Sequence, residues 1–391
     1  MSATRTNDSS KRQAVLYMAL ELGEKTWKVG FSMGLGQPPR QREIPGRAVM
    51  LLEEEIRAAK ERFGLPAQTP VVSCCEAGRD GFWLHRWLGS IGVESAVVDS
   101  SSIQVDRRQR RAKTDRLDLK RLLTMLVRYY QGERDVWRVV RVASVEQEDA
   151  RQLHRELQTL RGEQTAHSNR IKGLLSSCGV TLEVDRHLPK RLKELRLWDG
   201  LALPSDLHQR LLREFERMRV VNRQIRQLEK ERARRIRQEE KAPAVAQVRT
   251  LMGLKGIGVN SAWLYVREVF GWREIKNRRQ VGAIVGLVGS PYRSGDVNHE
   301  QGISKAGNRR MRAMAIEIAW GWLRFQPSSA LSRWYERRFA HGGKRLRRIG
   351  IVALARKLLV ALWKYLETGE PPADAELSDW KKKMHYTPSL V

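Results

Sequence analysis

The first 135 residues alternate short apolar runs with segments of helical spacing. Apolar runs on either side of a GEK turn at 14–33 predict two short strands, and runs at 70–78 and 94–100 predict two more. Residues 80–92 and 114–130 instead carry apolar side chains at the spacing of an amphipathic helix. Strands that alternate with helices indicate an α/β domain, which we place at residues 14–135.

Residues 136–245 have a different pattern, in which apolar positions recur every three or four residues within long charged stretches. Leu153, Leu157 and Leu160 lie in the first stretch, and the second runs from Leu211 to Leu228. A segment rich in helix breakers separates them, so the pattern predicts an antiparallel hairpin or coiled coil. Polar residues interrupt the apolar seam at Gln164, His167 and Asn222. The seam is therefore either short or completed by a partner.

The rest of the chain is predicted to be mainly helical. Residues 246–328 begin with a helix, a tight glycine turn and a second helix, and continue through a polar loop to a helix with an arginine-rich start. Residues 329–391 form a basic helical extension with a polar end. The fold class is thus α/β followed by α.

The net charge of the chain restricts its possible functions more than its length does. The 391 residues include 73 Lys and Arg against 44 Asp and Glu, a net charge of +29 spread over every segment. This excess predicts a nucleic-acid partner. An anionic membrane is the rival partner, but it usually requires a concentrated polybasic or amphipathic anchor. The apolar stretch near the C-terminus is interrupted by Arg356 and Lys357, which argues against a membrane span.

The N-terminal sequence and the cysteines predict that the protein works in a reducing cytosol. The N-terminal residues are polar and lack the apolar core of a signal peptide. The three cysteines form neither a CxxC pair nor a cluster with histidine, so zinc and a disulfide framework are not expected.

Two aspartates stand within a strongly basic segment. Asp115 and Asp118 are three residues apart, so a helix would place both carboxylates on one face. One interpretation is structural, because acids in a first helical turn are favoured by the helix dipole and pair with nearby arginines. The other is that they hold a metal that acts on a polyanion.

Two glutamates favour the metal interpretation. Glu21 lies at the end of the first predicted strand, and Glu76 closes the strand VVSCCE. A carboxylate beside a buried strand is costly without a compensating cation, and Mg²⁺ prefers several oxygen ligands. Two such ions can hold the attacking and leaving oxygens of a phosphodiester. The structural alternatives are a solvated strand end for Glu21 and a cap or salt bridge near Arg79 for Glu76.

The order Glu21, Glu76 and then KTDRLD resembles the RuvC-like domain, of RNase H fold, in DEDD-type transposases of the IS one-ten family. The motifs EAGRDGFWLHRWL and RRAKTDRLDLKRL match closely, while LELGEK has Glu21 where the family more often has Asp. The resemblance covers about residues 14–325. It implies that Glu21, Glu76, Asp115 and Asp118 are catalytic ligands of Mg²⁺, with two ions expected and Mn²⁺ as a substitute.

A second set of motifs, GIG, AIVGLVGSPYRSG and ISKAGNRRMR, resembles the serine-bearing domain of the same family. In that family a serine attacks the DNA backbone and holds the cut end as a phosphoserine. The motif assigns this role to Ser294, with Ser290 and Ser304 as alternatives. From the residues alone, a serine before Gly295 in a loop is more typical of a turn than of a nucleophile.

Basic and glycine-rich segments are the predicted nucleic-acid contacts. GLKGIGVNSA looks like a helix-hairpin-helix turn, in which Gly256 and Gly258 would let backbone amides face a phosphate. The other predicted contacts are Arg107, Arg108, Arg110, Arg111, Lys113, Arg293, Lys305, Asn308, Arg309, Arg310 and Arg312. A tight helix connection and a solvated basic face are the structural alternatives.

The resemblance implies a recombinase that excises and inserts its own element, guided by a noncoding bridge RNA that pairs with donor and target DNA. It further implies a dimer, joined through the hairpin, that pairs into a tetramer. Two other functions remain open from the sequence. One is a RuvC-like nuclease or junction resolvase that uses water, and the other is a non-catalytic nucleic-acid-binding scaffold.

Overall fold

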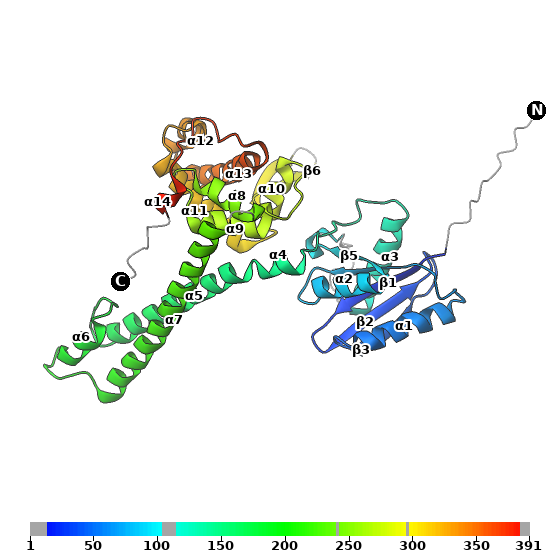
Figure 1. Cartoon of the computed structure of the whole chain (residues 1–391), viewed down its shortest axis with the longest axis horizontal. Coiled ribbons are helices and arrows are strands. Elements are labelled where there is room, and N and C mark those ends of the chain that lie inside the picture. Colours follow the sequence, from blue (N-terminus) through cyan, green and yellow to red (C-terminus); the bar gives the residue numbers. More distant parts are fainter. Residues whose placement is uncertain (1–13, 104–114, 240–241, 295–296, 384–391) are drawn as a thin grey trace, which may run out of the picture. The chain divides into compact units, whose positions relative to one another are not determined.

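A computed structural model describes residues 14–103, 115–239, 242–294 and 297–383. The chain divides into two compact units, Met1–Ala143 and Ser144–Val391, which are considered separately below (Figure 1). Among the described residues, no helix combines the length and the apolar character that crossing a membrane requires.

The first unit is built on a five-stranded sheet. Its strands are β1 (Leu16–Leu22), β2 (Thr26–Ser32), β3 (Arg40–Pro45), β4 (Val71–Glu76) and β5 (Glu94–Val98). The spatial order is β3-β2-β1-β4-β5. The first three strands form an antiparallel meander, whereas β4 pairs parallel to both β1 and β5. Strands β1 and β4 therefore end at the same edge of the sheet.

Helices cover both faces of this sheet (Figure 1). Helices α1 (Val49–Arg62) and α2 (Gly81–Ser90) pack on one face, and α3 (Asp115–Tyr130) packs on the other. Helix α3 lies very close to the sheet backbone, because a Cβ at Gly30 would lie 2.8 Å from Leu123 Cδ1. Glycine at this strand position lets the helix approach the sheet backbone.

A pair of long helices forms one part of the second unit. After the short α4 (Val145–Asp149), α5 (Gln152–Ser176) packs along α7 (Ser205–Gln238), with α6 (Leu188–Glu194) in the connection (Figure 1). The pair is antiparallel, as the cross-contacts show. Arg161 contacts Glu229, Gln164 contacts Asn222 and His167 contacts Glu214. Of the polar residues that interrupt the apolar seam, Gln164 and Asn222 thus pair with each other across it, and His167 pairs with Glu214.

The remaining residues form a helical body with a large apolar core. Its elements are α8 (Pro243–Met252), α9 (Val259–Tyr265), the π-helix η3 (Val266–Phe270), α10 (Arg278–Ile284), the hairpin of β6 (Gly289–Ser294) and β7 (Val297–Ile303), α11 (Arg309–Phe325), α12 (Ala330–Tyr335), the π-helix η4 (Glu336–Ala340), α13 (Lys344–Thr368) and α14 (Trp380–Lys383). Trp263, Tyr265 and Trp322 are fully buried in that core.

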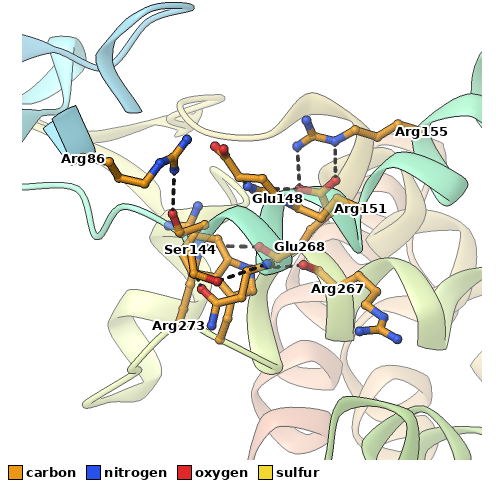
Figure 2. Close-up of polar contacts among 11 residues, drawn as sticks. Arg86, Ser144, Glu148, Arg151, Arg155, Arg267, Glu268 and Arg273 are labelled. Carbon is orange, nitrogen blue, oxygen red and sulfur yellow. Dashed lines mark hydrogen bonds and ion pairs between the residues drawn. The ribbon is translucent and has the colours of Figure 1, made fainter. Parts of the chain in front are cut away.

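An ion-pair cluster fastens the helix pair to the helical body (Figure 2). Arg155 on α5 donates two hydrogen bonds of 2.9 and 3.0 Å to the buried carboxylate of Glu268 on η3. Arg151 lies 3.8 Å from the same carboxylate, and the guanidinium groups of Arg151 and Arg273 both lie over the Trp272 ring. The buried Glu268 charge is thereby compensated from α5.

The structure confirms the strands predicted at 14–33, 70–78 and 94–100, and the helices predicted at 80–92 and 114–130. Strand β3 and helix α1 were not predicted. β3 is an edge strand with only Ile44 buried, and α1 begins without a side-chain cap, so neither carries a strong local signal.

Candidate functional site

A pocket of about 400 Å³ lies at the edge of the sheet where β1 and β4 end. Its walls come from the end of β1 and the turn that follows it, from the segment after β4, and from α3. Three of the four predicted carboxylates line it: Glu21, Glu76 and Asp118. Residues that are far apart in the sequence thus meet in one hollow.

Strand alternation explains why the two glutamates face α3. Ala19 on β1 and Cys74 on β4 belong to the apolar cluster beneath α3, whereas Leu20 and Cys75 belong to the cluster on the other face. Glu21 and Glu76 are each two residues beyond Ala19 and Cys74, so they point toward the α3 side. The parallel register pairs Leu20 with Cys75, which brings the two strand ends level.

Helix α3 supplies the third carboxylate from its first turn. Asp118 is half-buried, and the next residue, Leu119, is buried against the sheet together with Leu122. This apolar anchor holds the start of α3 over the ends of β1 and β4. Asp115 is the first residue of the helix, and its side chain lies outside the described part of the structure.

Three charged residues that the sequence had not singled out as site residues also line the pocket: Glu24, Arg79 and Asp80. Arg79 lies 3.3 Å from Glu24. The buried Asp80 accepts hydrogen bonds from Arg47 and from the Trp83 indole. Burial alone would raise the pKa of Asp80, but the bonds from Trp83 and Arg47 outweigh it and hold that pKa below its usual range.

The pocket has the donor type that Mg²⁺ prefers, since all three predicted ligands are carboxylates. Among the described side chains, no three of the type His, Cys, Asp or Glu are grouped closely enough to hold one ion. Glu21, Glu76 and Asp118 therefore line the same pocket, but their carboxylates do not converge on one point. A closed ligand set would need a further donor or a shift of these side chains.

The predicted serine nucleophile lies in the second unit. Ser290 and Ser294 belong to β6, and Ser294 pairs in register with Val297 of β7. The expectation of a loop at Ser294 is thus corrected to the end of a strand. Residues such as Tyr292 and Val297 favour strands, and they flank Gly295-Asp296, a sequence typical of hairpins. The side chains of Ser290, Arg293 and Ser294 lie outside the description, whereas Ser304 is exposed.

Glycine backbones lock the base of this hairpin to the start of α11. Gly286 and Gly307 both have positive φ angles, of 67° and 85°. A Cβ at Gly286 would lie 1.9 Å from the Ala306 carbonyl oxygen, and one at Gly307 would lie 2.2 Å from that of Ile284. Only glycine fits either position. The motifs that the sequence showed as separate are therefore one interlocked structure.

The predicted basic contacts divide into two groups. Arg309 and Arg310 are exposed at the start of α11, which Asn308 caps by accepting from the amides of Arg310 and Met311. Arg312 instead donates to the carbonyl oxygens of Val285 and Lys305 at 3.1 and 3.0 Å. Arg312 therefore ties the start of α11 to the residues before and after the β6–β7 hairpin. Arg107, Arg108, Arg110, Arg111 and Lys113 lie outside the described residues.

The glycine turn before α9 is anchored by the C-terminal extension. Gly256 has a φ of 87°, and Gly258 is the residue before α9. Lys255 pairs with Glu376, and the Gln326 side chain donates to the backbone carbonyls of both residues. These contacts hold the turn in place.

Several known proteins resemble this chain in sequence. Residues 248–336 match the family model described as Transposase IS116/IS110/IS902 family. Over 375 residues the chain is 41% identical to the putative transposase y4rJ of Sinorhizobium fredii, covering 90% of this chain and 92% of that protein. It is 26% identical over 307 residues to the transposase for insertion sequence element IS1111A of Coxiella burnetii, covering 77% and 78%.

These matches place the chain among the transposases of insertion sequences. Within that class, it belongs to the IS116/IS110/IS902 transposase family.

Proposed function

We propose that this protein cuts and rejoins DNA strands at the ends of an insertion element and at its target, with carboxylate-bound Mg²⁺ and a serine nucleophile. The observation that carries the proposal is the shared pocket of Glu21, Glu76 and Asp118. The strand order β3-β2-β1-β4-β5, with helices on both faces, supports a RuvC-like domain around that pocket.

In this proposal Glu21, Glu76, Asp115 and Asp118 hold the metal. Bound Mg²⁺ would neutralise charge on the phosphate and stabilise the oxygens that gain and lose a bond to phosphorus. Asp80, already held by Arg47 and Trp83, stays out of the ligand set and shapes the wall. Arg79 lines the same pocket and would contact a phosphate bound there.

The serine step belongs to Ser294, with Ser290 and Ser304 as the alternatives. The serine oxygen forms a bond to phosphorus while the bond from phosphorus to a sugar oxygen breaks. The serine hydroxyl loses a proton and the departing sugar oxygen gains one, so the number of phosphodiester bonds is conserved and strand rejoining is the reverse reaction. The close backbone contacts of Gly286 and Gly307 at the base of the hairpin support a fixed position for this segment.

Guidance by a structured noncoding RNA and assembly into dimers and tetramers are further parts of the proposal. The net charge of +29 is sufficient for several nucleic-acid segments at once. In this proposal the dimer forms through the antiparallel pair of α5 and α7, whose apolar seam is interrupted by the polar pair Gln164–Asn222.

A covalent-trapping assay tests the chemistry. The protein, expressed with the flanking DNA and any RNA that copurifies, is incubated with end-labelled element DNA and Mg²⁺, and then denatured. We expect a protein–DNA adduct that is absent in Ser294→Ala and in Asp118→Asn. Cleavage without an adduct would instead identify a nuclease that uses water, and an absence of cleavage in every Mg²⁺-containing mixture would leave only the binding scaffold.

A further inference from the structure

The start of helix α13 carries an exposed basic face outside the segment that matches the family model. Residues 344–349 are exposed at every position, and burial begins only at Gly350. From Ile351 onward the same helix supplies core residues such as Leu354 and Leu358. The first turn and a half therefore projects from the helical body rather than packing within it.

The cations of this segment lie on one side of the helix. At about 100° per residue, four of them share a continuous face of about 160°: Arg347, Lys344, Arg348 and Arg345. The two apolar residues of the segment, Leu346 and Ile349, project from the other side. Such segregation gives a charged surface of defined direction.

The preceding segment, Tyr335 and the π-helix η4, packs against the start of α13 on the side away from these cations. Phe339 of η4 packs so closely on Gly350 that a Cβ there would lie 2.4 Å from the ring, and the Tyr335 hydroxyl donates to the Arg347 carbonyl. These contacts hold the start of α13, and with it the four cations, in a fixed position. Arg338 of η4 lies over the Trp334 ring, which Lys357 of α13 also contacts, so Arg338 is not part of the cationic face.

No residue that the structure describes neutralises the four cations of this face. Their charged groups form no ion pair with any residue that the structure describes. Glu336, the first residue of η4, pairs with His341 instead. By contrast, exposed cations on α6 and α7, such as Arg219 and Arg234, pair with glutamates on their own helix.

The location is also unfavourable for cations unless an anion binds. The first turn of α13 contains no acid, and Gly343 offers no side chain to cap the free amides. The positive end of the helix dipole then adds to the charge of Lys344 and Arg345. A bound phosphate would relieve both the repulsion and the unsatisfied amides.

We propose that the face formed by Lys344, Arg345, Arg347 and Arg348 binds the backbone of duplex DNA. It goes beyond the proposed chemistry, because it requires neither the carboxylate pocket nor the serine. A fixed helical array of cations matches the regular phosphates of a duplex. A single strand would call for exposed aromatic rings, whereas Trp334 and Phe339 are largely covered.

The test measures binding without catalysis. A triple variant of the face, Arg345→Gln, Arg347→Gln and Arg348→Gln, is compared with a control triple of equal charge loss, Lys190→Gln, Arg219→Gln and Arg234→Gln. The control cations are exposed but already paired with glutamates. Binding to a labelled DNA duplex is followed by fluorescence anisotropy in EDTA, from about 0.05 to 0.2 M salt.

We expect the face variant to bind DNA about tenfold or more weakly, and its log–log salt slope to fall by about 2.7 for three lost phosphate contacts. The control should change affinity by less than about threefold, with an unchanged slope. Equal effects of the two triples would overturn the proposal. So would a loss of binding to a duplex RNA probe with DNA binding intact. Because EDTA removes catalysis, failure here is distinguishable from failure of the cleavage assay.

Discussion

Acidic side chains meet in a pocket of the first unit, whereas the second unit joins its motifs through backbone contacts. Glu21, Glu76 and Asp118 come from three elements, and their meeting depends on strand order and register. The hairpin β6–β7 and the start of α11 are neighbours in sequence, and Gly286 and Gly307 hold them together. The first site thus depends on side-chain chemistry, and the second on backbone shape. Substitutions should therefore affect them in different ways.

The largest expected effect is on the pocket. Asp118→Asn keeps the shape of the side chain but removes its charge, so we expect Mg²⁺-dependent strand cleavage to fall by about a thousandfold or more, equivalent to about 4 kcal/mol. DNA binding and unfolding free energy should stay near the wild-type values. Cleavage is measured on labelled element ends over a range of Mg²⁺ concentrations.

Glu24→Gln is the matched control, because Glu24 lines the same pocket but is exposed and faces Arg79. Its cleavage rate should change by less than about tenfold. Equal losses in the two variants would mean that the pocket responds to its total charge rather than to particular ligands.

The next effect should be on stability, in the second unit. Gly286→Ala forces a Cβ against the Ala306 carbonyl and a residue with a side chain into a positive φ, so we expect a loss of about 3 kcal/mol in unfolding free energy. Urea denaturation followed by circular dichroism measures it. Activity should fall as well, because the serine segment loses its support.

Gly200→Ala separates the two causes of that loss. Gly200 also has a positive φ, of 79°, but no atom lies near the position of its added Cβ. Only the conformational cost of about 1 kcal/mol should remain. If both alanine variants lost the same stability, the close contact with Ala306 would contribute nothing.

The comparison also shows what the sequence could and could not predict. The apolar runs located β1, β4 and β5, and the acids at the ends of β1 and β4 pointed to one edge of the sheet. Asp80 was missed as a pocket residue because its role depends on Arg47, which is 33 positions away. The backbone contacts of Gly286 and Gly307 were missed because they depend on φ angles and carbonyl positions, which glycines in a sequence indicate only in general terms.

Apart from the control variants, the smallest effect should be a pH dependence that arises in the second unit. His154 on α5 is 4% exposed, and neither ring nitrogen has a hydrogen-bond partner among the described residues. Burial lowers the pKa of His154 to about 4, and Arg232 reinforces the effect. Glu268 opposes the shift, while Arg161 and Arg310 add to it. The folded protein therefore keeps this ring neutral.

The sign of the pH effect follows from proton binding. An unfolded histidine has a pKa near 6.5, so between about pH 6.5 and 4 the unfolded chain binds a proton that the folded chain does not. Stability is complete above pH 6.5 and falls as the pH is lowered, by about 2 kcal/mol at pH 5. His154→Leu should lack this component, because leucine does not titrate and loses no hydrogen bond. Urea denaturation of both proteins at pH 7 and pH 5 measures the difference, and parallel losses in the two would show that His154 is not its source.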